Sequence, residues 1–283
     1  MIQFGPEQHE QIAEFISNYS GIVIDRLQPK RLGEKVIAEA RRLNLSSFED
    51  YLLLLKSSAG ESTRDSLMAK ITITESFFFR NPSQFRYLGH EHFPQLYRQK
   101  KMKGLNEVNI WSAGCSTGEE TYSLAYIASW FQLTHPDISF SITGTDINIA
   151  SLEKCRIGCY RPRSLRTQVA SILQEFAMPL GRDSADGFLI EEQLRRITEF
   201  RFANLRDLSS LKCRKGLDII FCRNVLIYFE DSFQQELICM FHNLLQPGGM
   251  LFLGETESLP TRHQFFELVP CCGAYGYRRP FEK

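Results

Sequence analysis

Short apolar runs that alternate with long helical patterns from residue 108 onward constrain the fold more than any other feature of this chain. Each run has the length and composition of a strand buried on both faces. The runs read VNIWSA, FSITGTDI, LDIIFCRN and GMLFLGE. The segments after the first and third runs, TYSLAYIASWF and SFQQELICMFHNLL, carry apolar residues at helical spacing. This alternation predicts an α/β fold, with a parallel sheet covered by helices on both faces.

The beginning of the chain has a different pattern, because it contains helical periodicity and no strand signal. EQIAEFISNYSGI, RLGEKVIAEARRLN and SFEDYLLLLKSS each place apolar residues three and four positions apart. Ser46 or Ser47 is a suitable N-cap for the third helix. We therefore expect a small all-helical domain over residues 1–74 and an α/β domain over residues 75–283.

Three details of the α/β domain depart from simple alternation. Residues 160–203 have many charges and a Gly/Asp/Ser-rich middle, so we expect them to contain an inserted small subdomain. LQPGGM fits a turn that ends a helix and begins the next strand. FFELVP and AYGYRR, separated by CCG, predict a closing antiparallel hairpin.

Composition excludes several classes of protein. Lys+Arg and Asp+Glu are both 33, so any basic surface must be a local patch, and we expect no nucleic-acid partner. No apolar run is long enough to cross a bilayer, and no charged-then-apolar leader precedes the first helix. The eight cysteines form no CxxC pair, and the six histidines have no metal-binding or catalytic spacing. We expect a cytoplasmic monomer with reduced thiols, without a metal and without membrane insertion.

The segment WSAGCSTGEETYS (111–123) joins the first predicted strand to its helix. Gly114 and Gly118 permit a tight turn and a close approach of a ligand to the backbone. The pattern is neither GxGxxG nor a P-loop, and two carboxylates stand where a phosphate would rest on the helix N-terminus. A ligand with a positive charge and no phosphate fits better, and S-adenosylmethionine is such a ligand. Another nucleotide or a purely structural turn remains an alternative for this loop alone.

Acidic residues in this region are candidate ligands for the cofactor. Asp146 ends the second predicted strand, where a carboxylate can accept both ribose hydroxyls. Glu119 and Glu120 are adjacent helical residues that point about 100° apart, so we expect only one of them to face the site. We favour Glu120, with Glu119 as the alternative.

The motifs together resemble those of a known family, the CheR chemotaxis receptor methyltransferases. They are ITITESFFFRN (71–81), WSAGCSTGEETYS (111–123), TGTDIN (143–148) and DIIFCRNVLIYF (218–229). The resemblance runs nearly from end to end. It implies a Rossmann-like domain that binds S-adenosylmethionine and releases S-adenosylhomocysteine. It also implies methyl esterification of glutamates on the cytoplasmic helices of methyl-accepting chemotaxis receptors, for chemotactic adaptation.

The resemblance assigns catalytic roles to two residues. Arg80 corresponds to the family's essential arginine, and its guanidinium could hold the carboxylate of the substrate or of S-adenosylmethionine. A surface salt bridge is the alternative. Tyr228 resembles the tyrosine near the transferred methyl group, and a core aromatic is its alternative. Thr74 and Ser76 resemble cofactor contacts, although Thr74 departs from the asparagine that is common in the family.

Further cofactor contacts follow from the same resemblance. Asn204 and Leu205 resemble the pair that brackets the adenine, since an amide has both a donor and an acceptor. Asn224 and Val225 follow a buried strand at the carboxyl edge of the sheet, where open α/β folds bind ligands. A turn-forming asparagine remains an alternative for Asn204 and Asn224.

A basic helix in the N-terminal domain is a candidate contact with the receptor. Arg31, Lys35 and Arg42 lie roughly along one helical face. In the family such a helix is thought to meet the acidic methylation helices of the receptor. The alternative is an ordinary solvated face.

The predicted reaction needs little catalytic machinery, because a glutamate carboxylate is ionised at neutral pH and is itself the nucleophile. Methyl transfer from a sulfonium depends mainly on alignment and on exclusion of water. Two other functions stay open. One is methyl transfer to a substrate that is not a receptor, and the other is a sensor or adaptor that binds S-adenosylmethionine without catalysis.

Overall fold

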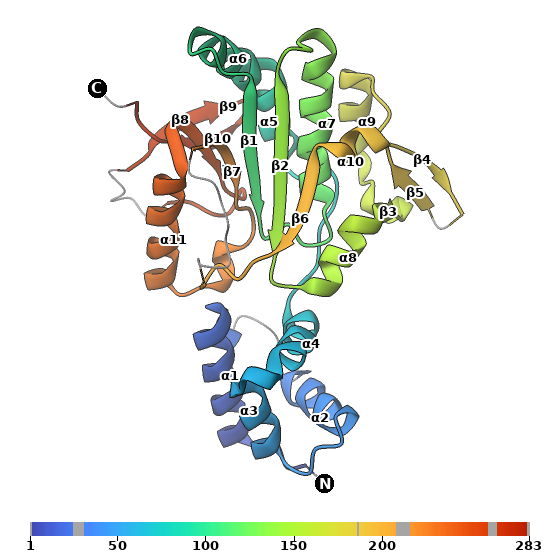
Figure 1. The fold of residues 1–283 in the computed structure, drawn as a ribbon, viewed down its shortest axis with the longest axis vertical. Coiled ribbons are helices and arrows are strands. Elements are labelled where there is room, and N and C mark those ends of the chain that lie inside the picture. Colours follow the sequence, from blue (N-terminus) through green and yellow to red (C-terminus); the bar gives the residue numbers. More distant parts are fainter. Residues whose placement is uncertain (1, 25–30, 186, 208–215, 260–264, 282–283) are drawn as a thin grey trace.

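The structure, a computed structural model, describes residues 2–24, 31–185, 187–207, 216–259 and 265–281. A bundle of helices lies at one end of the molecule, beneath an α/β domain (Figure 1). Its helices are α1 (Pro6–Ser20), α2 (Leu32–Arg42), α3 (Phe48–Lys56) and α4 (Glu61–Ile71), with the short turn η3 (Ser58–Gly60) before α4. Ser47 caps α3, as its side chain accepts a hydrogen bond from the Asp50 amide at 3.0 Å.

The α/β domain is built on a seven-stranded sheet of order β6-β2-β1-β7-β8-β10-β9. The first part of this order is parallel: β6 (Thr198–Phe202), β2 (Ser139–Asp146), β1 (Glu107–Ala113), β7 (Leu217–Phe221) and β8 (Leu245–Phe252). The hairpin of β9 (Glu267–Cys271) and β10 (Ala274–Arg278) closes the sheet in antiparallel fashion. The predicted α/β fold and the C-terminal hairpin are both confirmed.

Helices cover both faces of this sheet, and the strand residues alternate between two cores. Ile110 of β1 faces a core that includes Phe85, Tyr126 and Phe131, whereas Trp111 faces a core shared with the helical domain. The elements of the first side are α5 (Pro82–Tyr87), the π-helical η4 (Leu88–His92), α6 (Phe93–Met102) and α7 (Glu119–Thr134). On the second side, α11 (Asp231–Leu244) packs against the sheet (Figure 1).

A second, three-stranded sheet projects beside β6. Its order is β3-β5-β4, and all pairs are antiparallel. The elements of this region are α8 (Ile149–Ile157), β3 (Cys159–Tyr160), η5 (Pro162–Ser164), α9 (Thr167–Phe176), β4 (Gly181–Ser184), β5 (Gly187–Ile190) and α10 (Glu192–Arg196). Within residues 160–203, β6 pairs with β2 and so belongs to the main sheet, whereas the strands before it form the separate sheet.

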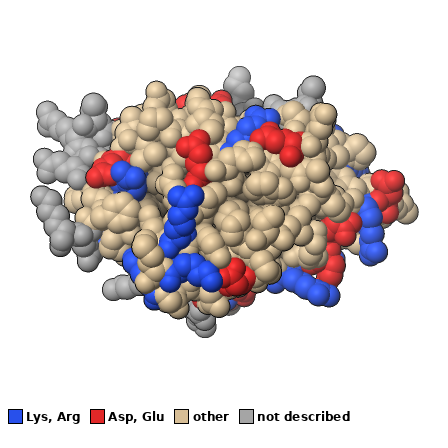
Figure 2. Space-filling view, turned by 90° about the horizontal axis from the view of Figure 1, so that it is seen from above, with Lys and Arg blue, Asp and Glu red and all other residues tan. Residues whose placement is uncertain are grey.

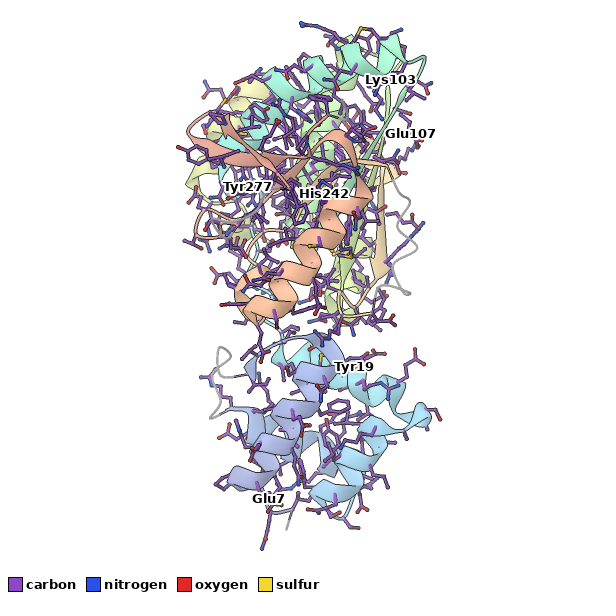
Figure 3. The ribbon with its side chains drawn as sticks, turned by 90° about the vertical axis from the view of Figure 1, so that its left-hand side faces the viewer. Glu7, Tyr19, Lys103, Glu107, His242 and Tyr277 are labelled. Atoms are coloured by element: carbon purple, nitrogen blue, oxygen red, sulfur yellow. The ribbon has the colours of Figure 1, made fainter. Side chains whose placement is uncertain are left out.

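The helical domain meets the α/β domain through hydrogen bonds from several segments. The Val23 amide donates to the Tyr228 carbonyl at 2.8 Å, and Asn204 Nδ2 donates to the Tyr19 carbonyl at 2.6 Å. Tyr19 lies at the end of the helical domain that faces the sheet (Figure 3). Because the carboxyl ends of β1, β2 and β7 point toward this junction, the helical domain forms a wall beside them (Figure 1).

Acidic and basic side chains are interspersed on the end of the molecule opposite the helical domain (Figure 2). Within the ranges that the structure describes, no helix is both long and apolar enough to cross a membrane.

Candidate active site

A cavity lies at the carboxyl ends of β1, β2 and β7, and the helical domain contributes Ser20 and Ile22 to its wall. Most of the site residues expected from the sequence line this cavity. They are Ser76, Arg80, Glu120, Asp146, Asn204, Leu205, Asn224, Val225 and Tyr228. Two of the expected cofactor ligands do not line it: Thr74 is exposed to solvent, and Glu119 is buried behind the loop.

The glycine loop has the backbone conformation that its sequence predicts. Gly114 and Gly118 have φ angles of 74° and 96°, in the left-handed region that disfavours side chains. A Cβ on Gly114 would lie 2.5 Å from Val225 Cγ2, so the loop and the segment after β7 are in close contact. The amides of Gly114 and Cys115 both donate to the Thr145 carbonyl, at 2.8 and 2.9 Å. The loop is therefore fixed against the end of β2.

Asp146 connects the glycine loop with the start of α8. Its Oδ2 accepts a hydrogen bond from the Ser116 amide at 2.7 Å, and its Oδ1 accepts one from the Asn148 amide at 2.8 Å. Burial raises the pKa of Asp146, and these backbone donors oppose the rise. The carboxylate is thus held at the strand end, in the lining of the cavity.

The two adjacent glutamates have different surroundings. Glu120 lines the cavity, accepts a hydrogen bond from Ser112 Oγ at 2.8 Å and places Oε2 3.1 Å from Arg223 Nε. Glu119 turns away and accepts hydrogen bonds from Thr117 Oγ1 at 2.6 Å and Ser164 Oγ at 3.4 Å. Burial raises the pKa of Glu120, and the positive charge of Arg223 works against that rise. Of the pair, only Glu120 lines this cavity.

Arg223 is a site residue that the sequence analysis did not single out. It is 5% exposed, and its guanidinium contacts Gln84 Oε1 at 3.1 Å and Asn81 Oδ1 at 3.2 Å, in addition to Glu120. Burial lowers the pKa of Arg223, and Glu120 opposes that effect. The position of Arg223 in the sequence could have indicated this role, because it directly follows the buried strand IIFC and the carboxyl end of a central strand points into the site.

Glu257 is a second residue that no sequence signal indicated. Its Oε2 accepts hydrogen bonds from the amides of Asn224 at 2.6 Å and Gly254 at 2.8 Å. Asn224 has a φ of 59°, and its Oδ1 is buried without a partner among the described residues, as is Ser116 Oγ. Buried polar atoms rarely lack partners, so the two atoms fit a ligand with several polar groups in this cavity.

Arg80 and Tyr228 lie at the same cavity. The Arg80 guanidinium is 5.5 Å from the centroid of the Phe77 ring, and no hydrogen bond or ion pair holds it within the described part of the chain. Tyr228 is half-buried, and burial raises its pKa, so its hydroxyl is protonated at neutral pH. The cavity therefore offers a cation that has no ion-pair partner among the described residues, and a hydroxyl donor.

Asn204 lines the cavity, but its amide already has partners. Nδ2 donates to the Tyr19 carbonyl, and Oδ1 accepts from the Arg206 amide at 3.0 Å. The side chain thus joins the α/β domain to the helical domain, and its Oδ1 contact with the amide two residues on fits the turn-forming alternative. Leu205 is buried beside it and contributes an apolar wall.

The basic residues expected on α2 have three different environments. Arg31 is exposed at the start of the helix. Lys35 donates from Nζ to the Lys70 carbonyl of α4, which leaves it partly buried. Arg42 is 60% exposed and pairs with the buried Glu39 at 2.6 Å. Arg31 and Arg42 are therefore accessible to a partner, whereas Lys35 also serves the packing of α2 on α4.

The fold and this cavity define a class of protein. A parallel sheet, a glycine turn after its first strand and a carboxylate at the end of the next are features of Rossmann-like S-adenosylmethionine-dependent methyltransferases. Among the described residues, no group of His, Cys, Asp and Glu side chains could hold a metal ion.

Comparison with known proteins gives the family. A family model described as "CheR methyltransferase, SAM binding domain" matches residues 74–273. The "Chemotaxis protein methyltransferase" of Vibrio parahaemolyticus is 30% identical over 273 residues, which are 95% of this chain and 96% of that protein. The protein of the same description from Escherichia coli is 31% identical over 260 residues, 91% and 86% of the two chains. The chain belongs to the CheR methyltransferase family, and S-adenosylmethionine is its cofactor.

Proposed function

We propose that this methyltransferase esterifies glutamate side chains on the cytoplasmic helices of methyl-accepting chemotaxis receptors. The observation that carries the proposal is Arg80, a cation at the cavity with no ion-pair partner among the described residues. A glutamate carboxylate that enters beside it would be oriented by a bidentate contact and would lose part of its hydration.

The other site residues suit the same reaction. S-adenosylmethionine supplies an electrophilic methyl group when it is bound. Glu120 and Asp146 offer carboxylates for its cationic and ribose groups, and Tyr228 offers a neutral hydroxyl at the same cavity. No general base is needed, because the attacking carboxylate is already ionised at neutral pH.

The relatives support the receptor as substrate, since they are chemotaxis protein methyltransferases that match over most of both chains. The substrate helices of such receptors lie in the cytoplasm, which is where we expect this enzyme. The accessible arginines of α2, Arg31 and Arg42, remain candidates for contact with a receptor helix.

Transfer of labelled methyl from S-adenosylmethionine to purified receptor cytoplasmic fragments tests the proposal. We expect incorporation that mild base releases as methanol, because carboxyl methyl esters are base-labile. Base-stable incorporation would indicate a different acceptor atom. Binding of S-adenosylmethionine without transfer to any fragment of a matched receptor panel would favour a sensor or adaptor.

The adjacent glutamates provide a matched pair of variants for the cofactor site. We expect Glu120→Gln to weaken the affinity for S-adenosylmethionine about 10-fold or more, because it removes a charged hydrogen-bond acceptor at the cavity. Glu119→Gln should change the affinity by less than about 3-fold, since that side chain lies outside the cavity. Isothermal titration calorimetry measures both, and equal losses would contradict the assignment.

A further inference from the structure

The loop between β3 and α9 carries three arginines within six residues beside the cavity. This rim loop, residues 161–166, reads RPRSLR and contains η5. Arg161, Arg163 and Arg166 are all exposed, and Leu165 is 36% exposed. The sequence analysis assigned no role to this loop, and none of its residues lines the cavity itself.

Contacts with the segment that carries Arg80 fix the rim loop in place. The Phe78 amide donates to the Ser164 carbonyl at 3.1 Å. The Arg166 guanidinium lies 3.8 Å from the centroid of Phe77, the same ring over which Arg80 lies at 5.5 Å. Arg166 also pairs with Glu75 at 2.8 Å, and both Glu75 and Phe77 line the cavity. The rim loop is therefore at the mouth of the active site.

Only one of the three rim arginines pairs with a carboxylate of the described residues. Among the described residues, no carboxylate lies within ion-pair distance of Arg161 or Arg163, and only Arg166 is paired. The whole chain has equal numbers of acidic and basic residues, so unpaired cations gathered at the site entrance are a local feature. Such a cluster attracts a partner of opposite charge.

We propose that the rim loop binds the acidic helix that presents the acceptor glutamate, through carboxylates one or two helical turns from that glutamate. This rests on the proposed function. Residues three, four and seven positions apart lie on the same helical face, so neighbours of the acceptor point toward the same surface of the enzyme. Arg161 and Arg163 contact these carboxylates, and Leu165 contacts the apolar part of the helix between them.

The proposal has a consequence for substrate choice. A neighbouring glutamate that has been methylated is uncharged, so it no longer attracts the rim arginines. The enzyme therefore binds a helix with free carboxylates next to the acceptor more tightly than one whose neighbouring sites are esterified. Each added methyl group makes the next transfer on that face less efficient.

Steady-state kinetics of the Arg161→Gln/Arg163→Gln double variant test the inference, with a soluble receptor cytoplasmic fragment as substrate. We expect KM for the fragment to rise about 3- to 20-fold, the effect of two exposed ion pairs, while kcat stays within about 2-fold. Affinity for S-adenosylmethionine should not change. The KM of the unmodified enzyme should also rise more steeply with salt than that of the variant, because exposed charge pairs are screened.

The control variant is Arg98→Gln/Lys103→Gln, which removes the same charge at the opposite end of the molecule. Both side chains are exposed, and Lys103 lies far from the helical domain (Figure 3). We expect its KM to stay within about 2-fold of that of the unmodified enzyme, since a distant surface charge contributes little. An equal rise in KM for both double variants would overturn the rim loop assignment and indicate a general charge effect.

A fragment with glutamine in place of the glutamates that flank the acceptor completes a double-mutant cycle. The unmodified enzyme should lose affinity for it, and the rim variant should lose little more, because the two changes remove the same contacts. Additive losses would overturn the inference while leaving the proposed function intact. If the unmodified enzyme transfers no methyl group to any receptor fragment, the proposed function fails and the rim inference fails with it.

Discussion

Arg80→Ala should lower kcat for methyl transfer by about 100-fold or more while the protein stays folded, the size of loss seen when a preorganised electrostatic contact is removed. The guanidinium lies at the cavity and makes no hydrogen bond or ion pair with other described residues, so folding does not depend on it. The free energy of unfolding should therefore change by less than about 1 kcal/mol. Single-turnover methyl transfer and urea unfolding measure the two effects.

Two further measurements locate what Arg80 holds. If it binds the substrate carboxylate, Arg80→Ala raises KM for the receptor fragment and leaves the affinity for S-adenosylmethionine unchanged. If it binds the carboxylate of the cofactor, calorimetry shows a weaker affinity for S-adenosylmethionine instead. Arg80→Lys should recover little activity, because an ammonium group cannot form the planar bidentate contact. Full activity in Arg80→Ala would exclude both roles.

The parts of the fold that were predictable depend on patterns within single segments. β7 is buried along its whole length and β1 along most of its length, so both read as short, mainly apolar runs whatever packs on them. The hairpin of β9 and β10 was evident because its turn lies between two short apolar segments. Once the strands were predicted, Asp146 and Asn224 could be placed near one another, since the carboxyl ends of parallel strands lie at one edge of a sheet.

One local pattern was misleading, because pairing with the neighbouring strand decides whether its residues form a turn or a strand. LQPGGM was expected to be a turn before the last parallel strand, but β8 already begins at Leu245. The extra residues are accommodated by a register shift, as Leu217 pairs with Leu245 whereas Ile219 pairs with Met250. The Gly248 amide donates to the Arg279 carbonyl at 2.9 Å, which fixes this irregular segment to the chain after β10.

The site details that escaped prediction depend on residues far apart in the sequence. Arg223 is held by Gln84, 139 positions away, and this contact aims it at Glu120. Asn204 donates to Tyr19, 185 positions away, so its amide serves the domain junction. Neither contact leaves a periodic signal, because a single polar side chain finds its partner only after the chain is folded. Glu120 was favoured over Glu119 from the sequence, and of the two only Glu120 lines the cavity.

The buried ion pair of Lys100 and Asp218 should have the largest effect on stability. Lys100 Nζ lies 2.7 Å from Asp218 Oδ1, and Asp218 also accepts from the Asn109 amide at 2.8 Å and from Gln246 Nε2. The two side chains are 7% and 0% exposed. Asp218→Ala should cost about 3–5 kcal/mol, because it leaves a buried ammonium without a counter-charge. Urea unfolding followed by circular dichroism measures the loss.

The neighbouring lysine supplies the control. Lys101 pairs with Asp137, but these side chains are 55% and 42% exposed, so Asp137→Ala should leave the urea midpoint close to that of the unmodified protein. Lys100→Met/Asp218→Leu should recover much of the loss, since an apolar pair needs no counter-charge. Asp218 lies near the amino end of β7 and Arg223 just beyond its carboxyl end, so the folded fraction of Asp218→Ala should keep its affinity for S-adenosylmethionine. Equal midpoints for Asp218→Ala and Asp137→Ala would show that the buried pair does not hold α6 against the sheet.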